Sequence, residues 1–217
     1  MSRTQRLLIV LALNIGLVTA LVAVGLTAHS LAVFAAGADC LADAAAVGVS
    51  LLAIRLAALP PSASRPHGYR HAPNVAALIN AGWLLAIYVA IGVAAIWNLS
   101  GGTGPVEGLP VLIVSAVTAV VLLAGALVLG GDLDDDEDGE DGEGDLNFKA
   151  VLLDTAADSA AAAGVAISGA IIFGTGGLYW LDPATALVIA IVVGYHAAKL
   201  LRKVVAALRS AQPIPER

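Results

Sequence analysis

Residues 31–56 read LAVFAAGADCLADAAAVGVSLLAIRL, an almost uninterrupted apolar run. A helix that crosses the hydrocarbon core of a bilayer needs about 20 predominantly apolar residues, so this stretch predicts a membrane-spanning helix. Two aspartates, Asp39 and Asp43, stand near its middle. The stretch therefore combines a spanning length with two acidic side chains that need a partner inside the membrane.

The composition of the whole chain is that of a membrane protein. Of its 217 residues, 59% are hydrophobic and 13% are charged, and the mean hydropathy is +0.89. A soluble globular domain has about 45–50% apolar and about 25% charged residues, so a soluble enzyme, a nucleic-acid binder and a disordered chain are excluded. The single cysteine, Cys40, excludes an intramolecular disulfide and a CxxC site. Its side chain diverges by about 100° from that of Asp39 on a helix, so we expect it to pack rather than to bind metal.

Six segments of the chain are long and apolar enough to span a bilayer. The first follows Arg3 and Arg6, as a secretory signal would, but its apolar run is longer than the usual 7–15 residues and no small-x-small cleavage site closes it. The sequence therefore predicts an all-α membrane protein with six transmembrane helices. They are Leu7–Leu26, Leu31–Leu56, Val75–Trp97, Leu109–Leu129, Phe148–Phe173 and Leu178–Leu200.

The basic residues orient these segments. With both termini in the cytoplasm, all 11 lysines and arginines fall on the inner side, as the positive-inside rule requires. We expect a transport domain over residues 1–205 and a short cytoplasmic tail over 206–217. Ten of the 17 acidic residues lie between Asp132 and Asp145. We expect an acidic cytoplasmic loop over 130–147, disordered and solvated, that concentrates cations near the site.

Four aspartates lie inside the predicted helices. Insertion of one aspartate at the bilayer centre costs about 2.5–3.5 kcal/mol. Asp39 and Asp43, and likewise Asp154 and Asp158, have i,i+4 spacing, which places each pair on one helix face. The two pairs reach a similar depth, so they predict a four-carboxylate, tetrahedral site for a divalent cation. Oxygen ligands favour harder ions such as Mn²⁺ or Fe²⁺, and Zn²⁺ also accepts carboxylate. The alternative is that these aspartates are protonated and hydrogen-bonded between helices.

These motifs resemble the cation diffusion facilitator family. The family's second helix carries an aspartate pair, its fifth carries H/D-x-x-x-D, and a Trp-x-Asp-Pro junction precedes its sixth. The corresponding stretches here are Ser30–Val33 with Asp39–Asp43, Gly68–Asn80 for the loop and third helix, Asp154–Asp158, and Leu181-Asp182-Pro183. The resemblance covers about residues 6–205. It implies six-helix metal transporters, usually homodimers, that exchange a cytosolic divalent metal ion for protons.

The chain departs from the family pattern at several points. Zinc-type members usually carry histidine where Asp154 stands, and the all-aspartate pattern resembles the manganese-type members. Pro73 replaces an acidic residue of the loop motif, which argues against a second metal site there. The chain ends about 17 residues after the last predicted helix, so we expect the ferredoxin-like domain with which most members end to be absent.

Five further polar residues are candidates for lesser roles. Asn14 would orient a carboxylate of the site or form an interhelical hydrogen bond. His29 would relay protons or bind the ion at the outer mouth, or it is a plain interfacial histidine. His67 and His71 would form an accessory cation site on the inner side. We expect Asp182, which precedes a proline in a turn, to cap a helix rather than to bind metal.

Two other functions compete with transport. Membrane prenyltransferases hold Mg²⁺-diphosphate with paired aspartates, but their motifs lie near aqueous helix ends, and no Asp-Gly-x-x-Ala-Arg motif of the CDP-alcohol phosphotransferases precedes Asp39. A membrane metal sensor or an assembly subunit would also fit the site. We expect a transporter rather than an enzyme: it binds its cation from the cytoplasm, rocks outward and releases the ion as protons occupy the carboxylates. Beyond the transported ion, protons and the lipid bilayer we expect no cofactor and no nucleic acid, and we expect a homodimer.

Overall fold

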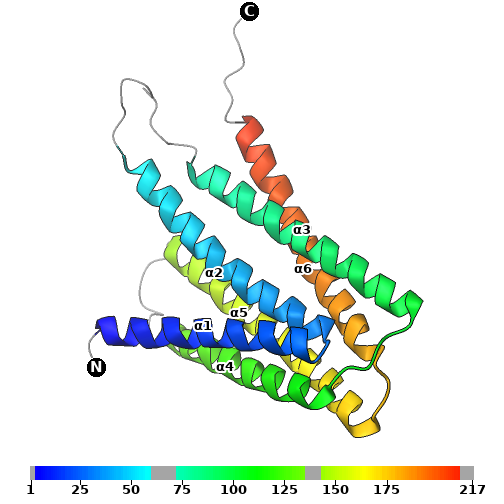
Figure 1. Cartoon of the computed structure of the whole chain (residues 1–217). Helices are drawn as coiled ribbons and strands as arrows, with labels where there is room; N and C mark the ends of the chain where they lie inside the picture. Colours follow the sequence, from blue (N-terminus) through cyan, green and yellow to red (C-terminus); the bar gives the residue numbers. More distant parts are fainter. Residues whose placement is uncertain (1–2, 60–71, 135–142, 211–217) are drawn as a thin grey trace, which may run out of the picture.

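The computed structural model describes residues 3–59, 72–134 and 143–210, and within these ranges every element is an α-helix (Figure 1). The predicted all-α class and the six helices are confirmed. The helices are α1 Arg3–Thr27, α2 Leu31–Ala57, α3 Ala72–Gly101, α4 Gly108–Asp134, α5 Glu143–Thr175 and α6 Leu181–Ser210.

Five of the six helices are long and apolar enough to cross a membrane. They are α2 to α6, and the described side chains of α1 add a shorter apolar stretch, Ile15–Thr27. Most large side chains on these helices face outward: Leu51, Val93 and Ile191 are all more than half exposed. Outward apolar side chains are what a lipid environment requires, since no water is present there to solvate polar ones.

The helices extend beyond the apolar segments from which they were predicted. The expected acidic loop 130–147 is too long, because α4 continues to Asp134 and α5 begins at Glu143. Likewise α6 continues past residue 205 to Ser210. A helix satisfies its own backbone hydrogen bonds, so it need not end where the apolar run ends. The remaining acidic stretch, 135–142, lies outside the described residues.

The helices form two close pairs. α4 packs most extensively on α5, and α3 packs on α6, whereas α2 contacts α1 and α3 much more than α5. Glycine permits the α4–α5 approach. A Cβ atom on Gly169 would lie 2.7 Å from the backbone nitrogen of Leu112, and one on Gly108 would lie 2.5 Å from that of Phe173. No side chain fits at these distances, so the two backbones are in direct contact.

The hydrophobic core occupies one end of the bundle. The three short connections, 28–30, 102–107 and 176–180, gather at that end, which charge bias predicts to be the outer one, and the helices diverge toward the other end (Figure 1). The core residues come from the adjoining helix halves: Leu21, Ala28, Ala32, Val33, Ala35, Tyr88, Ile91, Ala95, Val106, Val111, Val114, Val165, Ile172, Ala186, Ile189 and Ala190. We call this set the outer seal.

A polar clasp joins the first turns of α2 and α6 at the same end. Asp182, only 1% exposed, accepts hydrogen bonds from the Ser30 hydroxyl (2.5 Å) and the Leu31 backbone N–H (2.7 Å). The Ser30 hydroxyl in turn accepts the backbone N–H of Val33 at 3.1 Å. The expectation that Asp182 caps a helix from a turn is met only in part: Asp182 lies in the first turn of α6, and its carboxylate supports the N-terminus of α2, whose N-cap residue is Ser30. This clasp fixes the position of the first turn of α2, and thereby the positions of Asp39 and Asp43 further along the same helix.

Candidate metal site

Three of the four predicted carboxylates meet in the middle of the bundle. Ligand oxygens of Asp39 and Asp43 on α2 and of Asp158 on α5 all lie within 4.8 Å of one another. Asp39 and Asp158 are partly buried, and Asp43 is exposed. We call these three residues the carboxylate group. The convergence brings together side chains more than a hundred residues apart in sequence.

Local sequence explains why these side chains converge. Asp39 and Asp43 are one helical turn apart and so share a face of α2, and their small neighbours Ala35 and Ala42 are buried, which lets other helices approach α2 closely. Asp158 comes from α5, whose next residue, Ser159, donates a hydrogen bond to the Ala119 carbonyl of α4 at 2.9 Å. Asp154 lies one turn before Asp158 on α5, and its side chain is outside the described residues.

Three carboxylates at this separation favour a cation between them. Like charges so close repel strongly where water is scarce, and the repulsion is relieved by an opposite charge or by protonation. Carboxylate oxygens bind Mn²⁺, Fe²⁺ and Zn²⁺. The chemistry of the donor set thus fits a divalent transition-metal ion, and the exposed position of Asp43 provides a side from which an ion can approach.

The carboxylate group lies at the inner edge of the outer seal. On α2 the last residue of the seal, Ala35, precedes Asp39 by one turn, and on α5 the first, Val165, follows Asp158 by about two turns. Asp43 lies one further turn away from the seal. The route from the site toward the predicted outer end is therefore closed by packed apolar side chains.

Sequence reasoning missed Tyr88 on α3. This side chain is 1% exposed, and among the described residues its hydroxyl has no partner in full hydrogen-bonding geometry, although the Asp39 carboxylate lies close enough to interact with it. Of the surrounding charges, Asp39 acts on the hydroxyl most strongly, followed by Asp43 and Asp158. The available signal was a tyrosine in the middle of a spanning segment, since membrane tyrosines prefer the interfaces.

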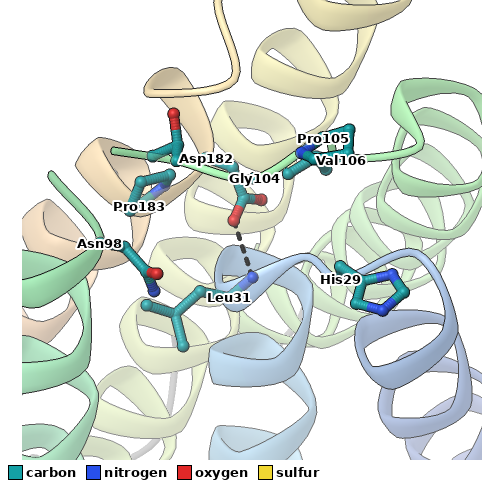
Figure 2. A pocket seen from close by; sticks show the side chains of 9 residues that line it. His29, Leu31, Asn98, Gly104, Pro105, Val106, Asp182 and Pro183 are labelled. Atoms are coloured by element: carbon teal, nitrogen blue, oxygen red, sulfur yellow. Dashed lines mark hydrogen bonds between the residues drawn. The ribbon is translucent and has the colours of Figure 1, made fainter. Parts of the chain in front are cut away.

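The residues predicted to have accessory roles lie either away from the carboxylate group or outside the described residues. His29 is exposed in the α1–α2 turn with a left-handed φ of 56°, and it lines a pocket of about 350 Å³ at the predicted outer end. Figure 2 shows its imidazole turned away from the Asp182 carboxylate. Cys40 packs against the outer seal. Nothing is described of the Asn14 side chain, and His67 and His71 lie outside the described residues.

The family of the chain follows from its sequence. Residues 7–209 match the profile of the cation efflux transmembrane domain. The chain belongs to the cation diffusion facilitator family. Together with the five apolar helices, this makes it an integral, multi-pass membrane protein.

Several named metal transporters and related proteins are similar to this chain. A cadmium, cobalt and zinc/H⁺-K⁺ antiporter of Bacillus velezensis is 29% identical over 182 residues, which cover 81% of this chain and 54% of the relative. The zinc transporter ZitB of Pectobacterium atrosepticum is 29% identical over 214 residues, 98% of this chain and 63% of the relative. Metal tolerance protein A2 of Arabidopsis thaliana is 34% identical over 110 residues, 50% of this chain and 28% of the relative. The chain spans about half to two-thirds of the length of the two bacterial relatives.

Proposed function

We propose that this protein exports a divalent transition-metal cation across a membrane by alternating access, in exchange for protons. The observation that carries the proposal is the convergence of Asp39, Asp43 and Asp158 within 4.8 Å on helices that are apolar enough to span a membrane. A membrane protein gains nothing in stability from such a group, because charge inside a bilayer is costly. An ion that binds and leaves accounts for it.

The position of the outer seal supports the alternating-access part of the proposal. Packed side chains close one side of the carboxylate group, and Asp43 is exposed on the other. This arrangement supports an inward-facing state, in which an ion would reach the carboxylates from the predicted cytoplasmic side. Separation of the seal residues, with closure of the inner ends, would then release the ion outward.

The carboxylates also support the proton-exchange part. A carboxylate must be deprotonated to bind a metal ion, so protons and metal compete for the same oxygens. Protons that enter from the outer side would displace the ion and would neutralise the group for the return step.

For the transported ion we propose Zn²⁺, Mn²⁺ or Fe²⁺. Zinc is named for both bacterial relatives, for one of them together with cadmium and cobalt, and intrinsic affinities for most ligand sets rise from Mn²⁺ towards Zn²⁺. The all-oxygen donor set instead favours the harder ions, Mn²⁺ and Fe²⁺. Assembly as a homodimer, which the family resemblance implies, stays a prediction.

Flux measurements in proteoliposomes test the function. We expect the wild-type protein to carry at least one of Zn²⁺, Mn²⁺ and Fe²⁺, and we expect Asp43→Ala and Asp158→Ala each to reduce the rate to that of protein-free liposomes while the protein stays folded. Glu107→Ala, which changes an exposed acid outside the carboxylate group, is the matched control. Transport by either variant at the wild-type rate would contradict the site. Metal binding without any wild-type flux would contradict the transport function.

A further inference from the structure

We propose that Tyr88 is a positioning residue of the metal site: its hydroxyl hydrogen-bonds the Asp39 carboxylate when the ion is bound and fixes the orientation of that ligand. The inference rests on the proposed function, since it assumes that the carboxylate group binds a cation. It assigns a role in ion binding to α3, a helix that contributes no described carboxylate, cysteine or histidine to the group.

The first observation is the state of the tyrosine itself. Tyr88 is the largest of the fully buried side chains described in this chain, and its hydroxyl meets no partner of hydrogen-bonding geometry among the described residues. Buried polar groups are nearly always paired, because an unpaired one loses its hydration without compensation. A phenylalanine would fill the same space without that loss, so packing does not explain the oxygen.

The second observation is the position of the hydroxyl. Asp39 is the charge that acts on it most strongly, and the other two members of the carboxylate group come next. The ring belongs to the outer seal, and its Cβ lies 3.7 Å from where a Cβ on Gly194 of α6 would stand. Tyr88 is thus anchored in the α3–α6 seam, and its hydroxyl lies close enough to the Asp39 carboxylate on α2 to interact with it.

A donor in this position has a defined chemical effect on the ligand. A carboxylate has two oxygens, and a hydrogen bond to one of them leaves the other to bind the metal in a fixed direction. Such outer partners of metal ligands typically change affinity by about 10–100-fold when they are removed. The ring anchorage also means that ion binding on α2 would be felt by the α3–α6 pair, which links the two parts of the bundle.

Binding of Co²⁺ to the full-length protein in detergent tests the proposal. Co²⁺ replaces the spectroscopically silent Zn²⁺, and its visible absorption reports the geometry of its ligands. We expect Tyr88→Phe to weaken Co²⁺ binding by about 10-fold and to change the position or intensity of the absorption bands, while the metal-free protein unfolds at the wild-type temperature or above. Tyr195→Phe, which removes the hydroxyl of an exposed tyrosine on α6, should leave affinity, spectrum and unfolding temperature unchanged.

The outcomes separate this inference from the proposed function. If the wild-type protein binds Co²⁺ and Asp43→Ala abolishes binding, but Tyr88→Phe keeps the wild-type spectrum, Tyr88 is structural and the inference is wrong even if affinity falls somewhat. If Asp43→Ala binds Co²⁺ as the wild type does, the carboxylate site itself is wrong and the inference falls with it. Should Tyr88→Phe unfold, Tyr88→His, which offers a ring donor of smaller size, should bind Co²⁺ with a changed spectrum, and a wild-type spectrum would again overturn the proposal.

Discussion

Replacement of Asp182 by alanine tests how strongly the polar clasp holds α2 to α6. The substitution removes the acceptor of two short hydrogen bonds, from the Ser30 hydroxyl at 2.5 Å and the Leu31 N–H at 2.7 Å. A buried donor left without an acceptor costs about 1–3 kcal/mol, so two of them cost about 2–6 kcal/mol. Part of this is offset because the variant no longer buries a carboxylate. We therefore expect Asp182→Ala to lower the free energy of unfolding by about 2–4 kcal/mol.

The measurement is reversible unfolding in detergent micelles, followed by circular dichroism. Glu107→Ala changes an exposed acid at the same end of the bundle and should stay within about 0.5 kcal/mol of the wild type. Asp182→Asn keeps one acceptor oxygen and should fall between the two. In a double-mutant cycle, Ser30→Ala and Asp182→Ala should couple by about 0.5–3 kcal/mol, as directly bonded partners do. The reasoning is refuted if Asp182→Ala is as stable as Glu107→Ala, or if the two clasp substitutions are additive.

Three further predictions address the ion and the packing. Metal affinity should fall as pH is lowered, because protons compete for the carboxylates; calorimetric titration in buffers of different ionisation enthalpy counts the released protons, and a count of zero would exclude exchange. Asp154→His should shift the transport ratio towards Zn²⁺ over Mn²⁺ in proteoliposomes, since imidazole favours zinc; an unchanged ratio would show that selectivity arises elsewhere. Gly169→Ala should destabilise the protein by about 1–3 kcal/mol, because its Cβ would lie 2.7 Å from the Leu112 nitrogen. Gly164→Ala on the same helix has open space and should unfold like the wild type.

Much of the fold was predictable because a membrane leaves few options. Apolar length alone identified six helices, and their existence is confirmed. The predicted ends of the helices were less accurate, since α4 reaches Asp134 although hydropathy falls before that residue. Hydropathy reports the membrane boundary, whereas helical hydrogen bonding continues past it. No local pattern distinguishes these two boundaries.

The part of the candidate site that follows from residue spacing along a helix was predictable. The i,i+4 pairing of Asp39 with Asp43 reports a shared face, and the facing position of Asp158 follows from the antiparallel order of the spanning helices. Tyr88 was not predictable, because its proximity to Asp39 depends on how the α3–α6 pair packs against α2. The same holds for the partner of Asp182: a cap in a turn was expected, but the carboxylate accepts the N–H of Leu31, 151 residues away in sequence at the start of α2.

The outer seal consists mostly of short side chains. Eleven of its 16 residues are alanine or valine, and each methyl or methylene group contributes only about 0.8 kcal/mol when it is removed from water. Short side chains also interlock less deeply than leucine or phenylalanine would, so a modest separation of the helices is enough to part them. In the alternating access that we propose, a barrier of this kind would block the passage of a hydrated ion and yet open at little cost in free energy. The rate of outward opening would then depend less on apolar contacts than on the few hydrogen bonds across the seal. Substitutions at Asp182 should therefore change the proposed transport rate without altering the carboxylate group.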